Sequence, residues 1–162
     1  MAENKNVQSD SERRITKIAL RVSLIVLAAL IAMSIVVMRT DERVRASGDM
    51  AARLTLRDPV SSAQVDLWYV DLASKSGLSL EQSGQTIMCF RDVAIESEPE
   101  LRGDAANALI SSLVVKLPQF ADAHAKKPIV AALDLADGLR KANRRGDQFC
   151  EGLRDLIDGS TP

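Results

Sequence analysis

An uncharged apolar run, Val22–Met38, is the feature that most constrains how this chain of 162 residues folds. Together with the preceding Ile18–Arg21 it makes a segment of 21 residues that contains one charge. As a helix this segment is about 31 Å long, which matches the hydrocarbon thickness of a bilayer. The rest of the chain is too small to enclose a helix that is apolar on every side. The sequence therefore predicts one transmembrane helix over residues 18–38.

Two processing signals compete with a permanent anchor. Val44-Arg45-Ala46 carries small or apolar residues where a signal peptidase reads them. The apolar run, however, exceeds the roughly 7 to 15 residues of a signal peptide. Arg13-Arg14 matches the arginine pair of a twin-arginine export signal, but Ile15-Thr16-Lys17 lacks the apolar pair expected next. We expect the anchor to be retained.

The basic residues that flank the predicted helix do not decide its orientation. Four lie close to each end: Arg13, Arg14, Lys17 and Arg21 on the N-terminal side, and Arg39, Arg43, Arg45 and Arg53 on the far side. A short N-terminal tail is easily left in the cytoplasm, and an even number of cysteines in the larger domain suits an oxidising compartment. We therefore expect a bacterial inner-membrane protein with a cytoplasmic N-terminus and a periplasmic C-terminal domain.

Composition and hydrophobic periodicity predict an all-α chain. Aromatic residues make up only 3% of the sequence, so the core depends on Leu, Val, Ile and Ala, which pack readily between helices. The expected organisation is a polar cytoplasmic tail over residues 1–17, the transmembrane helix over 18–38, a charged stalk over 39–59 and a helical extracytoplasmic domain over 60–162. The last of these should be a small antiparallel bundle of four to five helices.

Start and stop signals divide this domain into five segments. The first runs from Ser61 to a stop at Gly77, although its Val65–Val70 stretch is rich in strand formers and leaves a strand open. Capping boxes mark the second and third starts, at Ser79 and Ser97. The remaining signals are a stop at Pro118, a start at Pro128, a stop at Gly146, a start at Asp147 and a stop at Gly159.

The two cysteines, Cys89 and Cys150, are candidates for a disulfide. The bond would close a loop of 61 residues and stabilise the domain by about 4 kcal/mol on the chain-entropy model. The alternative is two separate buried thiols that behave as small apolar side chains. Neither cysteine lies in a metal-binding spacing, and His124 is the single histidine, so we expect no metal and no cofactor.

Three further groups of residues are candidates for contacts. Trp68, Tyr69 and Arg57 follow the stalk and are residue types that dominate interface energetics; the alternative is that Trp68 fills the core and Tyr69 lies at its rim. A basic cluster suits an anion or an acidic partner, or simply the negative end of a helix dipole: Arg140, Lys141, Arg144 and Arg145. In the apolar segment, Ala28 and Ala32 form a small-x-x-x-small pair that would let two copies of the helix pack closely, so a homo-oligomer stays open.

Catalysis is not expected. Carboxylates such as Glu81 and Asp92 could in principle form a glycosidase pair, but sugar clefts usually present aromatic platforms, and this chain has few aromatic residues. Phosphate loops and nucleophile elbows are absent from the sequence. The net charge of −1 argues against a nucleic-acid partner.

The predicted layout favours a tethered interaction domain. Its partners would be the lipid bilayer and a protein in a membrane complex, for which the chain serves as an accessory, scaffold or adaptor subunit. A regulator or sensor of envelope or lysis machinery is the first alternative, and a membrane-tethered envelope hydrolase is the second.

Overall fold

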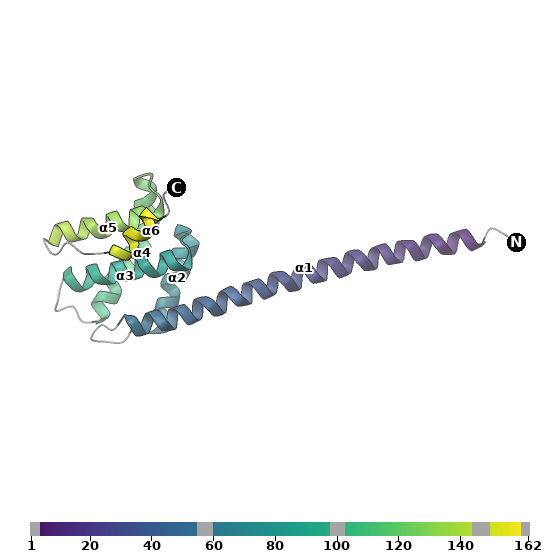
Figure 1. Cartoon of the computed structure of the whole chain (residues 1–162), viewed down its shortest axis with the longest axis horizontal. Coiled ribbons are helices and arrows are strands. Elements are labelled where there is room, and N and C mark those ends of the chain that lie inside the picture. Colours follow the sequence, from purple (N-terminus) through teal and green to yellow (C-terminus); the bar gives the residue numbers. More distant parts are fainter. Residues whose placement is uncertain (1–3, 55–59, 98–102, 144–149, 160–162) are drawn as a thin grey trace. The chain divides into compact units, whose positions relative to one another are not determined.

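The computed structural model describes residues 4–54, 60–97, 103–143 and 150–159, and within them every regular element is a helix. The six helices are α1 (Asn4–Arg53), α2 (Ser62–Ser76), α3 (Leu80–Ser97), α4 (Gly103–Ala123), α5 (Pro128–Asn143) and α6 (Glu151–Asp158) (Figure 1). The predicted all-α fold, with one long apolar N-terminal helix and a helical bundle, is confirmed. The chain divides into two units, Met1–Glu42 and Arg43–Pro162.

The second unit begins earlier than the stalk prediction implies. Residues 43–53 continue α1 and pack against the bundle, with Ser47 and the following Leu54 fully buried. Ala46 and Met50 lie half-buried against the same core. This stretch therefore contributes to the bundle instead of spacing it from the anchor. The physical reason is that its apolar and small residues recur every three to four positions, which gives the helix a face to bury.

Helix α3 is the centre of the second unit and packs against α2, α4, α5 and α6. It can do so because small or apolar residues cover most of its circumference, including Ile87, Phe90, Val93 and Ala94. Helix α5 brings buried alanines to this core, which let helix backbones approach closely: Ala131, Ala132 and Ala136.

Gly84 permits a second close approach on α3. A Cβ at this position would lie 3.1 Å from the Tyr69 hydroxyl and 3.3 Å from Cε of Met50. A larger side chain would push Tyr69 and Met50 away from α3. Gly84 therefore marks a close contact of α3 with Tyr69 of α2 and Met50 of α1.

The predicted signals around Gly77 and Ser79 are confirmed. Gly77 adopts the left-handed conformation (φ 66°), its N–H bonds to Ala73 O at 3.2 Å, and Leu78 N–H bonds to Leu72 O at 3.3 Å. This ends α2 as a helix and removes the strand alternative for residues 65–70. Ser79 and Gln82 then form the capping box, with bonds of 3.0 Å to the Ser79 N–H and 3.2 Å to the Gln82 N–H.

The stop predicted at Pro118 is wrong. Helix α4 continues through this proline to Ala123 and ends in a turn where Ala125 is left-handed (φ 50°). Proline removes one backbone hydrogen bond, but Leu117 and Ala121 on either side of it are buried, and their packing keeps the helix intact.

The start at Pro128 and the stop at Gly159 are confirmed by the bounds of α5 and α6. The capping box expected from Ser97, the stop at Gly146 and the start at Asp147 depend on residues outside the described ranges.

Candidate functional site

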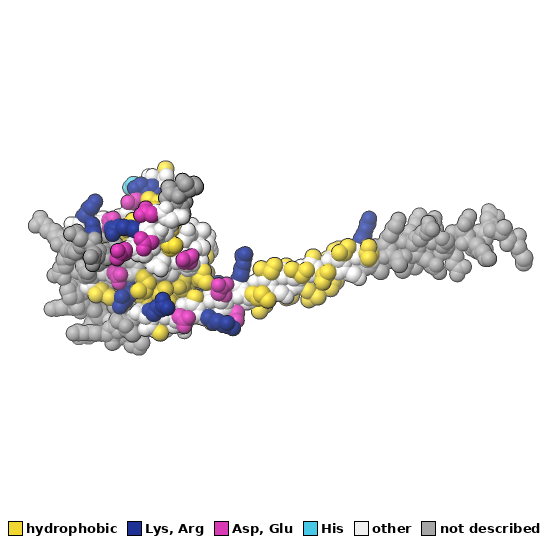
Figure 2. All heavy atoms as spheres, in the orientation of Figure 1, with side chains coloured by type: hydrophobic (Ala, Val, Ile, Leu, Met, Phe, Trp, Pro, Cys, Tyr) yellow, Lys and Arg dark blue, Asp and Glu magenta, His cyan; other side chains and the backbone are white. Residues whose placement is uncertain are grey.

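The apolar part of α1 is the first candidate site. Within the described ranges it is the one helix long and apolar enough to span a membrane, and none of its apolar stretch is buried against the rest of the protein. Figure 2 shows hydrophobic side chains all along this stretch. Exposure of this extent on a soluble protein would be an aggregation hazard, whereas it is the normal surface of a helix in lipid.

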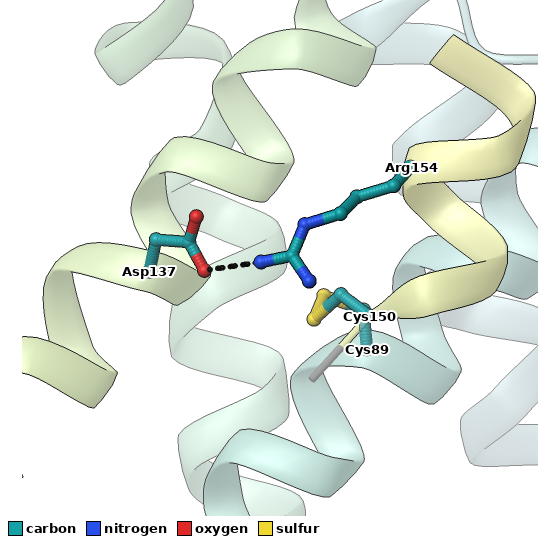
Figure 3. The surroundings of a disulfide bond; sticks show 4 residues. All are labelled: Cys89, Asp137, Cys150 and Arg154. Atoms are coloured by element: carbon teal, nitrogen blue, oxygen red, sulfur yellow. Dashed lines mark hydrogen bonds and ion pairs between the residues drawn. A yellow bond between two sulfur atoms is a disulfide. The ribbon is translucent and has the colours of Figure 1, made fainter. Parts of the chain in front are cut away.

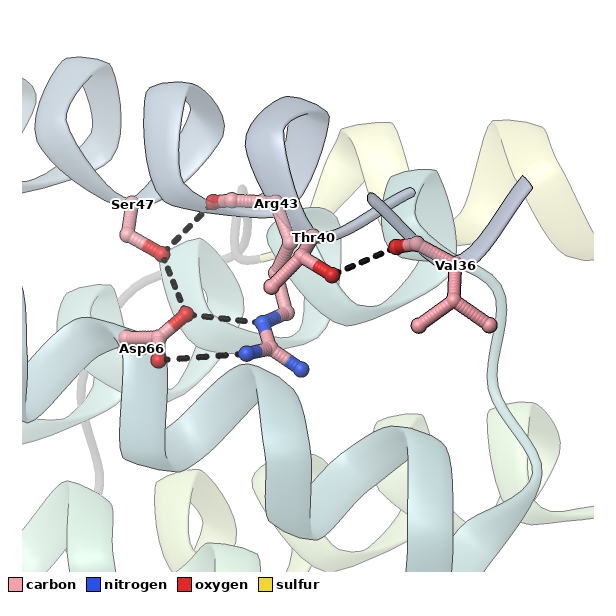
Figure 4. Close-up of polar contacts among 5 residues, drawn as sticks. All are labelled: Val36, Thr40, Arg43, Ser47 and Asp66. Atoms are coloured by element: carbon pink, nitrogen blue, oxygen red, sulfur yellow. Dashed lines mark hydrogen bonds and ion pairs between the residues drawn. The ribbon is translucent and has the colours of Figure 1, made fainter. Parts of the chain in front are cut away.

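Hydroxyl groups in this part of α1 satisfy their own hydrogen bonds. Within the apolar run, the Ser34 hydroxyl donates to Leu30 O at 2.9 Å. Just after the run, the Thr40 hydroxyl donates to Val36 O at 2.5 Å (Figure 4). A hydroxyl in hydrocarbon has no water to bond, so bonding to the carbonyl one turn earlier removes most of the cost of placing it there.

A polar joint connects α1 to α2 within the second unit. Arg43 Nε donates to Asp66 Oδ1 at 2.8 Å, and Arg43 Nη2 lies 3.5 Å from Asp66 Oδ2. The Ser47 hydroxyl is 2.8 Å from Arg43 O and 3.2 Å from Asp66 Oδ1 (Figure 4). These three residues, the α1–α2 joint, fix the start of α2 against α1. Sequence reasoning missed the joint because Asp66 is 23 residues from Arg43, and nothing in the sequence pairs the two.

We expect Asp66→Ala to lower the free energy of unfolding by about 1 to 2 kcal/mol, because it leaves the half-buried Arg43 guanidinium without its carboxylate. Asp71→Ala is the matched control, since half-buried Asp71 forms an i,i+4 pair with the exposed Lys75 at 2.9 Å. The control should lose at most about 0.5 kcal/mol. Urea unfolding of the full chain in detergent measures both, and equal losses would show that the joint is no stronger than a surface pair.

A disulfide between Cys89 and Cys150 attaches α6 to α3 (Figure 3). The two Cα atoms are 4.5 Å apart, within the range for disulfides, so the predicted bond is confirmed. Arg154 Nη2 also donates to Asp137 Oδ1 of α5 at 3.2 Å. Leu153 between these contacts is buried. Helix α6 is too short to be stable alone, and these contacts hold it on the bundle.

The predicted partner contacts at Trp68 and Tyr69 need correction. The structure buries both residues, leaving 2% and 3% of their surfaces exposed. Trp68 Nε1 donates to the Ser111 hydroxyl of α4 at 2.8 Å, and Tyr69 lies over Gly84 of α3. Neighbouring side chains on α2 are both covered because α4 packs on Trp68 and α3 packs on Tyr69. Arg57, the third residue of this prediction, is outside the described residues.

Ionisation of Tyr69 reflects this burial. Loss of hydration raises the pKa of the Tyr69 hydroxyl, and the nearby positive charge of Arg53 lowers it by less. Tyr69 therefore stays neutral at physiological pH and serves as a packing residue.

The carboxylate pair considered for hydrolysis is too widely spaced. Glu81 and Asp92 are both on α3 and eleven residues apart, so about 16 Å of helix axis separates them. Glycosidases need about 5 to 9.5 Å between their carboxyl groups. Asp92 instead pairs with Arg91 at 3.2 Å, and burial raises the pKa of its carboxyl while Arg91 opposes the shift.

The basic cluster at the end of α5 and the alanine pair on α1 stay predicted contact sites. Arg140 and Lys141 lie in the last turn of α5, Arg140 half-buried and Lys141 exposed, a position that suits either a helix-dipole role or a contact with an anion. Their predicted companions Arg144 and Arg145 are outside the described residues. Ala28 and Ala32 are exposed on α1.

In the part of the chain that the structure describes, no three His, Cys, Asp or Glu side chains gather into a group that could hold a metal ion. Comparison with protein-family models, with curated proteins and with solved structures gives no significant match.

Proposed function

We propose that this protein is a membrane-anchored helical interaction domain that acts as an accessory, scaffold or adaptor subunit of a bacterial envelope complex. The observation that carries the proposal is that one helix, α1, is apolar and exposed over residues 20–38 and packs into a folded bundle at its end. Such a chain holds its folded part beside the membrane, where a tether raises the effective concentration for membrane partners.

A binding role, in place of catalysis, agrees with how the bundle uses its charged groups. Five carboxylates are engaged in ion pairs with neighbouring cations: Asp66, Asp71, Asp92, Asp134 and Asp137. These pairs either connect two helices or lie on the surface of one helix. A catalytic carboxylate would instead need to face a substrate.

The proposed orientation has the N-terminus in the cytoplasm of a bacterial inner membrane and the bundle in the periplasm. The Cys89–Cys150 disulfide supports it, because structural disulfides form and persist in oxidising compartments. We expect a reporter enzyme fused after Pro162 to be active if it works only in the periplasm. A matched fusion of a reporter that works only in the cytoplasm should be silent, and the reverse pattern would overturn the orientation.

The proposal of a protein partner is tested by extracting the chain in mild detergent and identifying the proteins that co-purify by mass spectrometry. We expect a defined membrane protein to be recovered at a constant ratio to the chain. The paired change Arg140→Glu and Lys141→Glu should reduce this recovery if the basic turn of α5 is the contact. Lys116→Glu with Lys127→Glu makes the same charge change at exposed positions elsewhere and is the control. A chain that always purifies alone would contradict the adaptor proposal.

A further inference from the structure

One row of side chains on α2 faces away from the bundle. Ala63 and Leu67 are exposed and Val70 is half-buried, at the i, i+4, i+7 spacing that places residues on one helix face. Leu67 is 59% exposed, an unusual value for a leucine outside the apolar part of α1. The buried residues of the same helix occupy the opposite face: Val65, Trp68, Tyr69, Leu72 and Ser76. We call Ala63, Leu67 and Val70 the outer row of α2.

The outer row lies next to the α1–α2 joint. Leu67 directly follows Asp66, which Arg43 holds at 2.8 Å. Val44, the neighbour of Arg43 on α1, is also an exposed apolar residue, with 54% of its surface accessible. Each partner of this ion pair therefore has an exposed apolar residue next to it in the sequence.

The joint is also tied closely to the membrane segment by the chain itself. Arg43 is five residues after Met38, the last residue of the apolar run, and the chain between them is helical. Five helical residues extend about 8 Å, and even a fully extended chain of this length reaches only about 18 Å. The headgroup layer on each side of the hydrocarbon core is about 5 to 8 Å thick. Asp66 and Leu67 thus cannot lie far from the lipid headgroups.

Charges beside the outer row are neutralised. Asp66 pairs with Arg43, and Asp71 pairs with Lys75 at 2.9 Å. Paired charges at a headgroup boundary are less costly to dehydrate than isolated carboxylates, which anionic lipids would repel. Moving leucine and valine side chains from water into the boundary between headgroups and acyl chains lowers the free energy.

We propose that the outer row of α2, together with Val44, docks on the lipid bilayer beside the anchor, so that α2 lies on the membrane as an interfacial helix. The inference rests on the proposed membrane anchoring of α1. A tether of five residues keeps the local lipid concentration high, so that three or four small apolar side chains suffice for contact.

A depth measurement in vesicles tests the proposal. The full chain with Leu67→Cys is labelled with an environment-sensitive nitrobenzoxadiazole dye, without reductant, so that the native cysteines stay bonded. It is reconstituted at low density into vesicles of phosphatidylethanolamine and phosphatidylglycerol. We expect blue-shifted emission and strong quenching by nitroxides on the lipid acyl chains. Val115→Cys is the matched control, because Val115 is an apolar residue with similar exposure (53%) on α4 and should report water.

The outcomes separate this inference from the anchor. Carbonate washing of the same vesicles shows whether the chain is inserted. If the chain resists washing while the dye at position 67 behaves like the dye at 115, the docking inference fails and the anchor stands. If carbonate extracts the chain, both fail. A blue shift that grows with protein density and resists the lipid quencher would assign the row to a second copy of the chain and overturn lipid docking.

Discussion

Replacing either cysteine should cost about 4 kcal/mol of unfolding free energy, because it removes the disulfide between them. The bond joins residues 61 positions apart, and its loss frees that loop in the unfolded chain. Cys89→Ser, Cys150→Ser and the double variant should be equally unstable, because each removes the same crosslink. Denaturant unfolding of the full chain in detergent, followed by circular dichroism, measures the three losses.

Reduction supplies the control for this prediction. The wild-type chain treated with a dithiol should unfold at the denaturant concentration of the double variant. If the double variant loses as much stability as the two single variants together, the cysteines are two independent packing sites. A wild-type chain whose stability does not change under reduction would show that the bond is absent in solution.

Trp68→Ala should destabilise the protein by about 3 to 5 kcal/mol, since it removes the indole from the core between α2 and α4 and leaves a cavity. It also removes the donor to the Ser111 hydroxyl. Leu67→Ala at the adjacent exposed position is the matched control and should change stability by no more than about 0.5 kcal/mol in detergent. Thermal unfolding by circular dichroism compares the two variants. A Trp68→Ala chain as stable as its control would contradict the burial described above.

Helix positions could be predicted from the sequence wherever the signal was local. Gly77, the capping box at Ser79 and Pro128 each act through backbone groups within a few residues, and all three are where the sequence predicted them. Pro118 misled the prediction because its local cost is outweighed by burial of Leu117 and Ala121, which depends on helices distant in the sequence.

The candidate contacts were harder to predict for the same reason. Whether Trp68 and Tyr69 are exposed depends on what α1, α3 and α4 cover, and no periodicity in residues 62–76 reports that. The α1–α2 joint was likewise hidden, because a single arginine and a single aspartate 23 residues apart carry no spacing signal. The disulfide was predictable because two cysteines allow only one intramolecular pairing.

Burial of Trp68 has a practical consequence for experiments in membranes. The chain has one tryptophan and one tyrosine, adjacent on α2, and the apolar part of α1 has neither. Ultraviolet emission from the intact protein in vesicles therefore comes entirely from the interior of the bundle, while insertion of the anchor adds no signal of its own. The folding state of the bundle can thus be read optically in a lipid bilayer, without a label and without cutting the protein from its anchor.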